Sequence, residues 1–393
     1  MRSTKLFSFI IVILMLTVVF AGLTPLSAGA GNATTTAAVA PYTARVSNAA
    51  TAAVKTSPVV GAGTWHTQTV DSSGDVGYAT SLALTSSGGP AISYVDWTTS
   101  NLKYTYKDAS GWHNQVVDSA GFMAMSTSLQ LTPSGWPAIS YYNNTNGDLK
   151  YAFKDAAGWH IQVVDRAGAT GTYGTSLALT PTGWPAISYK DVHNTLKYTY
   201  KDASGWHNQV VDSSGNVGDG NSLQLTSAGW PAISYYLGTG GYLKYTYKDA
   251  SGWHNQVVDS SGNVGGKFTS LALTPTGWPA ISYWDQTNSD LKYTYKDASG
   301  WHNQVVDSSG GVGDSTSLQL TPTGWPAISY YNWTYGDLKY TYKDATGWHT
   351  QTVDSGGDVG GWNSLQLTTT GWPAISYQDI GNSSLKYAYK SPS

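Results

Sequence analysis

Short stretches of alternating hydrophobic and polar residues recur along the chain after residue 64. One such stretch is 149–154, where Leu149, Tyr151 and Phe153 alternate with Lys, Ala and Lys. Successive side chains of a strand point to opposite faces, so this alternation predicts a β-strand. The same unit contains three further predicted strands, at 128–131, 137–141 and 159–164, with tight turns at 132–135 and 155–158. We therefore predict that the unit is a four-stranded antiparallel meander.

A Trp-His pair marks the same point of every unit. The pairs begin at Trp65, Trp112, Trp159, Trp206, Trp253, Trp301 and Trp348, which gives a repeat of 47 or 48 residues. Short strands, tight turns and this period restrict the candidate folds to a propeller, a sandwich or a solenoid. Of these, only a propeller makes every unit equivalent. We predict an all-β fold, a seven-bladed β-propeller of four-stranded antiparallel blades, over residues 64–393.

The phase of the repeat predicts how the ring closes. The first unit begins with a fourth strand at 65–70, and the last unit ends with a third strand at 385–390. The last blade therefore lacks its outer strand, and we expect the N-terminal strand to complete it. Closure of this kind pairs two strand edges that would otherwise be open to aggregation.

The segment before the repeats has two predicted parts. Met1, Arg2 and Lys5 precede an apolar run at 6–23 and small residues that end at Ala30, which is the order of a secretory signal peptide over 1–30. An uncleaved membrane anchor is the alternative, because the apolar run is just long enough to span a bilayer. Residues 31–63 are rich in Ala and Thr and predict a flexible linker. We expect a protein that is secreted or lies on the extracellular surface, with a mature form that does not span the membrane.

Composition narrows the classes of function. The chain has no cysteine, so burial and hydrogen bonds must stabilise an exported protein without disulfides. The net charge is −3 and the basic residues are spread along the repeats, which argues against nucleic acid as a partner. All 24 acidic residues are Asp, so mechanisms that require Glu are excluded. We expect a monomer without a metal or other cofactor.

The repeated turn Lys-Asp-Ala-Ser-Gly-Trp-His resembles the Asp-box hairpin of sialidase-like propellers, in which an Asp and a Gly shape the turn. The whole unit is also similar to tandem-repeat propellers of microbial surface proteins and to propeller lectins. The resemblance implies a propeller over about residues 64–390. Sialidase chemistry does not follow, because that family uses three arginines and a Tyr–Glu pair, whereas this propeller has Arg166 alone and no Glu. We assign no catalytic residue and expect Asp108 and Gly111 to shape the hairpin.

The two rims of the predicted propeller differ in sequence. The turns between first and second strands and between third and fourth strands are nearly invariant, and we call their rim the invariant rim. The other loops differ from unit to unit and form the variable rim, where binding residues are expected to gather. The variable-rim candidates for ligand binding are Asp96, Trp97, Asp191, Trp284, Asp285, Trp333 and Asp379. Aromatic rings beside acceptors suit carbohydrate or peptide, and the alternative is that each Asp caps its own loop.

The invariant rim offers a second set of candidates. One Trp ends the first turn in six of the seven units, at Trp136, Trp184, Trp230, Trp278, Trp325 and Trp372. Exposed indole rings stack on sugars, and their repetition would give avidity. The alternative is that they pack between blades, which is favoured because large aromatic side chains mostly bury their surface.

We expect an extracellular or cell-surface binding module that recognises carbohydrate or a surface polymer through repeated shallow sites. One alternative is a hydrolase or lyase that acts on polysaccharide with two of the Asp residues as acid and base. Another is a structural surface or adhesion module. Binding is favoured over catalysis because the Asp residues recur on equivalent blades and no single pair stands apart.

Overall fold

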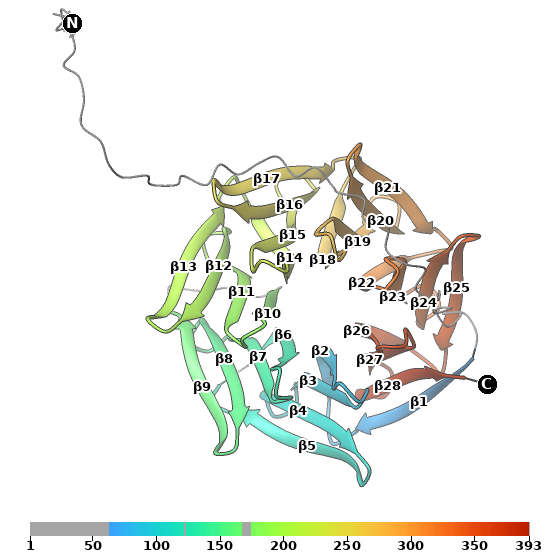
Figure 1. The fold of residues 1–393 in the computed structure, drawn as a ribbon. Helices are drawn as coiled ribbons and strands as arrows, with labels where there is room; N and C mark the ends of the chain where they lie inside the picture. The colour runs from blue at the N-terminus through green and yellow to red at the C-terminus, as the bar shows by residue number, and fades with distance from the viewer. Residues whose placement is uncertain (1–62, 122, 167–173, 393) are drawn as a thin grey trace, which may run out of the picture. The chain divides into compact units, whose positions relative to one another are not determined.

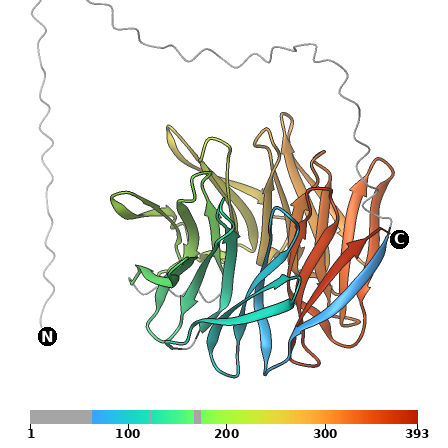
Figure 2. The ribbon, with the colours of Figure 1, turned by 60° about the horizontal axis from the view of Figure 1, so that its bottom comes forward.

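The computed structural model describes residues 63–121, 123–166 and 174–392, which form seven four-stranded antiparallel sheets around a common axis (Figure 1). Each sheet is one blade, and Figure 2 shows the same blades in a tilted view. The prediction of an all-β, seven-bladed propeller is confirmed. The predicted signal peptide and all but the last residue of the predicted linker lie outside the described residues. Within the described part of the chain, no helix is long and apolar enough to cross a bilayer.

Each blade contributes one strand to each of four concentric positions, from the axis outwards. The innermost strands of blades one to seven are β2 (Val76–Leu84), β6 (Met123–Leu131), β10 (Thr175–Leu179), β14 (Val217–Leu225), β18 (Val264–Leu273), β22 (Val312–Leu320) and β26 (Val359–Leu367). The second strands are β3 (Pro90–Asp96), β7 (Pro137–Asn143), β11 (Pro185–Lys190), β15 (Pro231–Leu237), β19 (Pro279–Asp285), β23 (Pro326–Asn332) and β27 (Pro373–Asp379). The third strands are β4 (Asn101–Asp108), β8 (Asp148–Asp155), β12 (Leu196–Asp202), β16 (Tyr242–Asp249), β20 (Asp290–Asp297), β24 (Asp337–Asp344) and β28 (Ser384–Ser391). The outer strands are β5 (Gly111–Asp118), β9 (Gly158–Asp165), β13 (Gly205–Asp212), β17 (Gly252–Asp259), β21 (Gly300–Asp307), β25 (Gly347–Asp354) and β1 (Thr64–Asp71).

The N-terminal strand closes the ring as predicted. Strand β1 pairs antiparallel with β28, with Trp65 opposite Lys390 and Gln68 opposite Tyr387. In Figure 1 the blue β1 lies along the outer side of the red β28. The seventh blade therefore contains one strand from the start of the repeats and three from their end.

Neighbouring blades share a hydrophobic core, and a hydrogen bond between a serine and a leucine repeats at each interface. Between blades one and two, Leu102 and Tyr104 pack with Leu129 and Ile139. A serine hydroxyl of each innermost strand accepts a hydrogen bond from a leucine N–H of the next blade. The seven bonds, at 2.9–3.0 Å, join Ser81 to Leu129, Ser128 to Leu177, Ser176 to Leu223, Ser222 to Leu271, Ser270 to Leu318, Ser317 to Leu365 and Ser364 to Leu82. The last bond joins blade seven to blade one and completes the circle.

The Trp of each Trp-His pair lies between two blades. Trp112 donates its indole N–H to Gln68 at 3.3 Å, and its ring meets that of Tyr387 edge-on at 5.5 Å. Lys107 donates to the same Gln68 at 2.8 Å and lies 5.7 Å from the ring centre of Trp112. Equivalent bonds to Gln recur at all seven blades. These tryptophans therefore join blades.

An Asp at the end of each outer strand also bonds to the next blade, and five of the seven are buried, at Asp71, Asp118, Asp165, Asp212 and Asp259. Asp71 accepts hydrogen bonds from Tyr94 at 2.6 Å and from Lys103 at 2.5 Å, and it is 4 % exposed. Burial acts to raise the pKa of Asp71, but hydrogen bonds from Lys103 and Tyr94, among others, outweigh burial and lower that pKa to about 2. The carboxylate is therefore held ionised where two blades meet.

Candidate binding sites on the two rims

Five tryptophans of the invariant rim are exposed. Trp136 is 38 % exposed, and its equivalents in blades three to six are each 40 % exposed, at Trp184, Trp230, Trp278 and Trp325. Trp372 of blade seven is only half-buried, and a side chain at Gly63 would come within 2.9 Å of its ring. Blade one has Gly89 at this position. The exposed indoles thus lie on five neighbouring blades, and the expectation that packing would bury them is not met at those five.

The turn that presents each indole is fixed by its own residues. In blade three, Trp184 N–H donates to Thr180 Oγ1 and Thr180 N–H donates to the Trp184 carbonyl, both at 2.9 Å. Gly183 has a φ of 85°, a value that a residue with a side chain adopts only at a cost. Because the same Thr-x-x-Gly-Trp pattern recurs, each Trp leaves its turn in the same orientation.

The third-to-fourth turns place a polar cluster on the same rim. In blade one, Asp108 Oδ1 accepts hydrogen bonds from the Ser110 N–H at 2.8 Å, the Ser110 hydroxyl at 2.7 Å and His113 Nε2 at 2.9 Å. These bonds lower the pKa of Asp108, that from the Ser110 hydroxyl most. Ser110 and Asp108 both lie at the same nitrogen of His113, so this is not the relay in which a His joins a Ser to an Asp through its two nitrogens. The Asp108 side chain is 48 % exposed and can accept a further bond from solvent or ligand.

The four aspartates of the variable rim are buried and bind their own loops. Asp191 is 2 % exposed, and its Oδ1 accepts from the N–H groups of His193 and Thr195, each at 3.0 Å. Asp96, Asp285 and Asp379 accept equivalent bonds from their own loops. The four carboxylates also lie 3.4–3.8 Å from a Lys of the third strand. This geometry favours the alternative in which each Asp caps its loop, and it does not bring any two of the four together as an acid–base pair.

The variable-rim tryptophans are less deeply buried. Trp284 and Trp333, on blades five and six, meet edge-on at 4.8 Å. Trp333 is 37 % exposed and lies against Gly311, where any side chain would collide with its ring at about 2 Å. Trp97 packs at 5.3 Å from Tyr78. Trp284 and Trp333 thus form one aromatic surface, and Trp97 lies apart from it on blade one.

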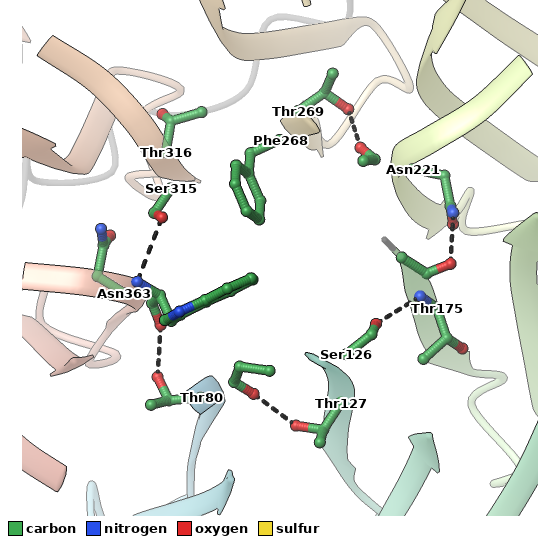
Figure 3. A pocket seen from close by; sticks show the side chains of 14 residues that line it. Thr80, Ser126, Thr127, Thr175, Asn221, Phe268, Thr269, Ser315, Thr316 and Asn363 are labelled. Carbon is green, nitrogen blue, oxygen red and sulfur yellow. Dashed lines mark hydrogen bonds between the residues drawn. The ribbon is translucent and has the colours of Figure 1, made fainter. Parts of the chain in front are cut away.

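A cavity of about 150 Å³ opens at the variable-rim end of the central channel (Figure 3). It forms because the innermost strands lose their regular pairing with the second strands near their first residues. In blade one the register shifts between Tyr78 and Ser81, so Ala79 and Thr80 have no partners in β3. Each blade contributes two residues to the wall, although the second of them is paired with the second strand in blades two, three and five. They are Ala79, Thr80, Ser126, Thr127, Gly174, Thr175, Gly220, Asn221, Phe268, Thr269, Ser315, Thr316, Trp362 and Asn363.

The cavity wall is held by hydrogen bonds between neighbouring blades. The second wall residue of a blade, a Thr or Asn, donates its side-chain hydrogen to the backbone carbonyl of the first wall residue in the preceding blade. Thr127 of blade two donates in this way to Ala79 of blade one at 2.8 Å. The same bond joins Thr80 to Trp362, Asn221 to Gly174 and Thr269 to Gly220 at 2.8–2.9 Å. Ser126 instead accepts from the Thr175 N–H at 2.8 Å. The dashed lines in Figure 3 trace these bonds around the opening.

Sequence reasoning did not identify this cavity, although the chain carries a signal for it. The strand ending Ser-Leu-x-Leu is nearly invariant, but the residue two places before that Ser is Ala, Ser, Gly, Gly, Phe, Ser and Trp in the seven units. One variable position inside a constant strand indicates a side chain that the core does not use. Within the described part of the chain, no three His or Asp side chains gather as a metal site requires.

Comparison with known proteins identifies the fold and no family. No protein-family model matches the chain, and no curated protein matches it. Among solved structures it is similar to AofleA of Arthrobotrys oligospora, with a TM-score of 0.52 and 12 % identity over 74 % of this chain and 90 % of that chain. Aleuria aurantia lectin in complex with Fucα1-6GlcNAc gives a TM-score of 0.50 and 11 % identity over 71 % and 96 %. Virginiamycin B lyase of Staphylococcus aureus gives 0.56 and 9 % over 84 % and 100 %. At these identities the likeness concerns the fold alone.

Proposed function

We propose that this protein is a binding module that holds carbohydrate chains or a similar surface polymer through repeated shallow sites on its invariant rim. The observation that carries the proposal is the equal exposure of five tryptophans, 38–40 %, on five neighbouring blades. The exposed part of each indole adds little to folding, so its recurrence in identical turns is better explained by a ligand. The N-terminal sequence supports a place of action outside the cell.

The invariant rim carries exposed polar groups as well as the exposed indoles. The CH face of a sugar ring stacks on an indole, and its hydroxyls need donors and acceptors nearby. The same rim provides exposed Asp, Ser and His side chains at its third-to-fourth turns, such as Asp202 and His207 in blade three, which also carries Trp184. A single shallow site of this kind binds weakly, but several sites together bind a polymer tightly through avidity. We call the five exposed tryptophans the tryptophan arc: Trp136, Trp184, Trp230, Trp278 and Trp325.

The similarity to a lectin seen with a bound disaccharide shows that this fold supports sugar binding in another protein. The similarity to a lyase supports no catalytic role here, because the aspartates that would act as acid and base are buried in their own loops. A purely structural surface module remains the competing function, and the binding test separates the two.

The test is binding of the full chain to an array of immobilised polysaccharides. The variant Trp136→Ala/Trp230→Ala/Trp325→Ala removes alternate members of the arc, and Trp333→Ala is the control on the other rim. We expect the triple variant to lose at least about tenfold in apparent affinity and the control to stay within about twofold. The proposal is overturned if no polysaccharide binds the folded protein, or if Trp333→Ala alone abolishes binding.

A further inference from the structure

We propose that the cavity at the variable-rim end of the channel is a separate site for one neutral sugar unit or a polyol of similar size. The residues that line this site lie at the innermost strands around the axis, whereas the tryptophan arc lies on the turns of the invariant rim, and the site does not depend on the arc binding anything. The two sites would differ in ligand: the arc would hold chains, and the cavity would take a single ring.

The chemistry of the wall selects for a neutral, hydroxyl-rich ligand. None of the fourteen described residues that line the cavity is charged, and nine of them are Ser, Thr or Asn. An ionised carboxylate or phosphate would lose its hydration there without a counter-charge among these residues. Hydroxyls can both donate and accept. Ser126 accepts from the Thr175 N–H, so its own O–H is left to donate, whereas Thr127 donates to Ala79, accepts from Ser93 and has one further lone pair to offer.

Two aromatic rings make one side of the cavity apolar. Phe268 of blade five and Trp362 of blade seven meet edge-on at 5.3 Å, with Ser315 of blade six between them in the wall. Figure 3 shows Phe268 turned into the opening, with Ser126 and Thr127 across from it. A cavity with aromatic rings on one side and hydroxyls on the other matches a sugar ring, which has a CH face and hydroxyl edges.

The backbone at Trp362 gives an independent reason to assign it a function. Trp362 has a φ of 51°, and Ala79 and Ser315 have φ values of 50° and 52° at the equivalent positions. An L-residue pays about 1–2 kcal/mol for this left-handed conformation. Glycine, which adopts it freely, occupies the position at Gly174 and Gly220. A bulky Trp in this conformation is therefore not there to stabilise the fold, and strained residues of this kind cluster at ligand sites.

One substitution can remove an aromatic ring from the cavity, and another can fill the cavity. Trp362→Gly removes the indole and suits the existing backbone. Ala79→Trp places in blade one the side chain that blade seven already carries at the equivalent position, so the fold accommodates it and the cavity is filled. The matched control is Tyr335→Ala, which removes an exposed aromatic ring that neither lines the cavity nor belongs to the invariant rim.

The experiment is saturation-transfer NMR of the full chain with methyl glycosides of neutral hexoses and of fucose, with inositol, and with glucuronate as the charged comparison. Ligands are supplied at up to about 20 mM, because a single ring with few bonds binds with a Kd on the order of millimolar. We expect at least one neutral ligand to bind. Trp362→Gly should weaken it at least about fivefold and Ala79→Trp at least about tenfold, with the control within about twofold of the wild type.

The proposal is overturned if no neutral ligand binds, if glucuronate binds more tightly than every neutral ligand, or if both cavity variants bind as the wild type does. It is also overturned if the control loses the monosaccharide as much as the cavity variants do. Polysaccharide binding by Trp362→Gly is measured in parallel. Failure at the cavity with an intact arc, or the reverse, separates this proposal from the proposed function.

Discussion

The indole N–H of Trp65 donates a hydrogen bond to the side-chain oxygen of Gln351 at 3.0 Å, although 286 positions separate the two residues in the chain. The ring of Trp65 also meets that of Tyr340 edge-on at 5.4 Å. These are the contacts that Trp112 makes with Gln68 and Tyr387 at another interface. The joint between blades six and seven, which depends on the N-terminal strand, is thus chemically the same as the others.

Trp65→Ala should destabilise the whole propeller. It removes one indole bond and one aromatic contact from a half-buried position at the outer strand of blade seven. We expect the free energy of unfolding in urea to fall by about 2–3 kcal/mol. Tyr335→Ala, at a position that is 70 % exposed, should change it by no more than about 0.5 kcal/mol. Equal effects of the two substitutions would show that β1 contributes little to closure.

The protein should lose stability in acid through the buried carboxylates between blades. The pKa of Asp71 is about 2 in the folded protein against an ordinary value of 3.8. A lowered folded pKa means that the stabilisation is present above pH 4 and disappears as the pH falls from about 4 to 2, and for Asp71 it amounts to about 2 kcal/mol. The pKa of the equivalent Asp259 is also about 2.

Asp71→Asn should therefore unfold more easily than the wild type at neutral pH and show a shallower loss of stability between pH 4 and 2. Urea unfolding at a series of pH values measures both. If the pH dependence of the variant matches that of the wild type, Asp71 is not one of the groups that cause it.

Ala79→Gly should leave the stability unchanged or raise it by up to about 1 kcal/mol. Glycine relieves the left-handed backbone at this position, which offsets its larger entropy in the unfolded chain. Ala91→Gly is the matched comparison, because Ala91 is buried in the regular part of β3. We expect that substitution to cost about 1 kcal/mol or more. Thermal unfolding compares the two, and a larger loss at Ala79 would contradict the strain assigned to this position.

Binding to a polymer should fall in steps as tryptophans are removed from the arc. Trp230→Ala should weaken polymer binding about two- to threefold, and each further substitution should multiply the loss, because every site adds to avidity. Binding of a short oligosaccharide that reaches one site should weaken only in proportion to the number of sites removed. Titration of both ligands against the series measures the difference, and complete loss from one substitution would indicate a single dominant site.

The fold could be predicted because its signals are local and repeated. Alternation in stretches such as 149–154 indicates strands, and the position of Trp65 before the first complete blade indicates how the ring closes. In blade two the predicted first strand, 128–131, is shorter than the observed β6. Its register shifts between Met123 and Thr127, so a regular alternation does not describe its beginning.

The sites were harder to predict because they depend on where the blades meet. The position of Asp191 in a variable loop suggests a hydrogen-bond acceptor for a ligand. Its carboxylate instead accepts from the backbone N–H groups of His193 and Thr195 in the same loop. The exposure of Trp184 depends on how far the turn projects from the rim, which sequence does not state. The cavity depends on residues such as Thr80 and Phe268 that leave their ladders and come together only around the axis.

The bonds from serine to leucine have one further consequence. Ser364 accepts from Leu82 just as Ser81 accepts from Leu129, so this bond does not distinguish the interface between blades seven and one from the others. The position in the ring at which the repeats begin is therefore set by the chain connectivity and not by the Ser–Leu bonds between blades. A circular permutant that joins Ser391 to Thr64 through a two-residue turn, as Ala109 and Ser110 join Asp108 to Gly111, and opens between another third strand and its outer strand would contain the same contacts. It should assemble the same ring.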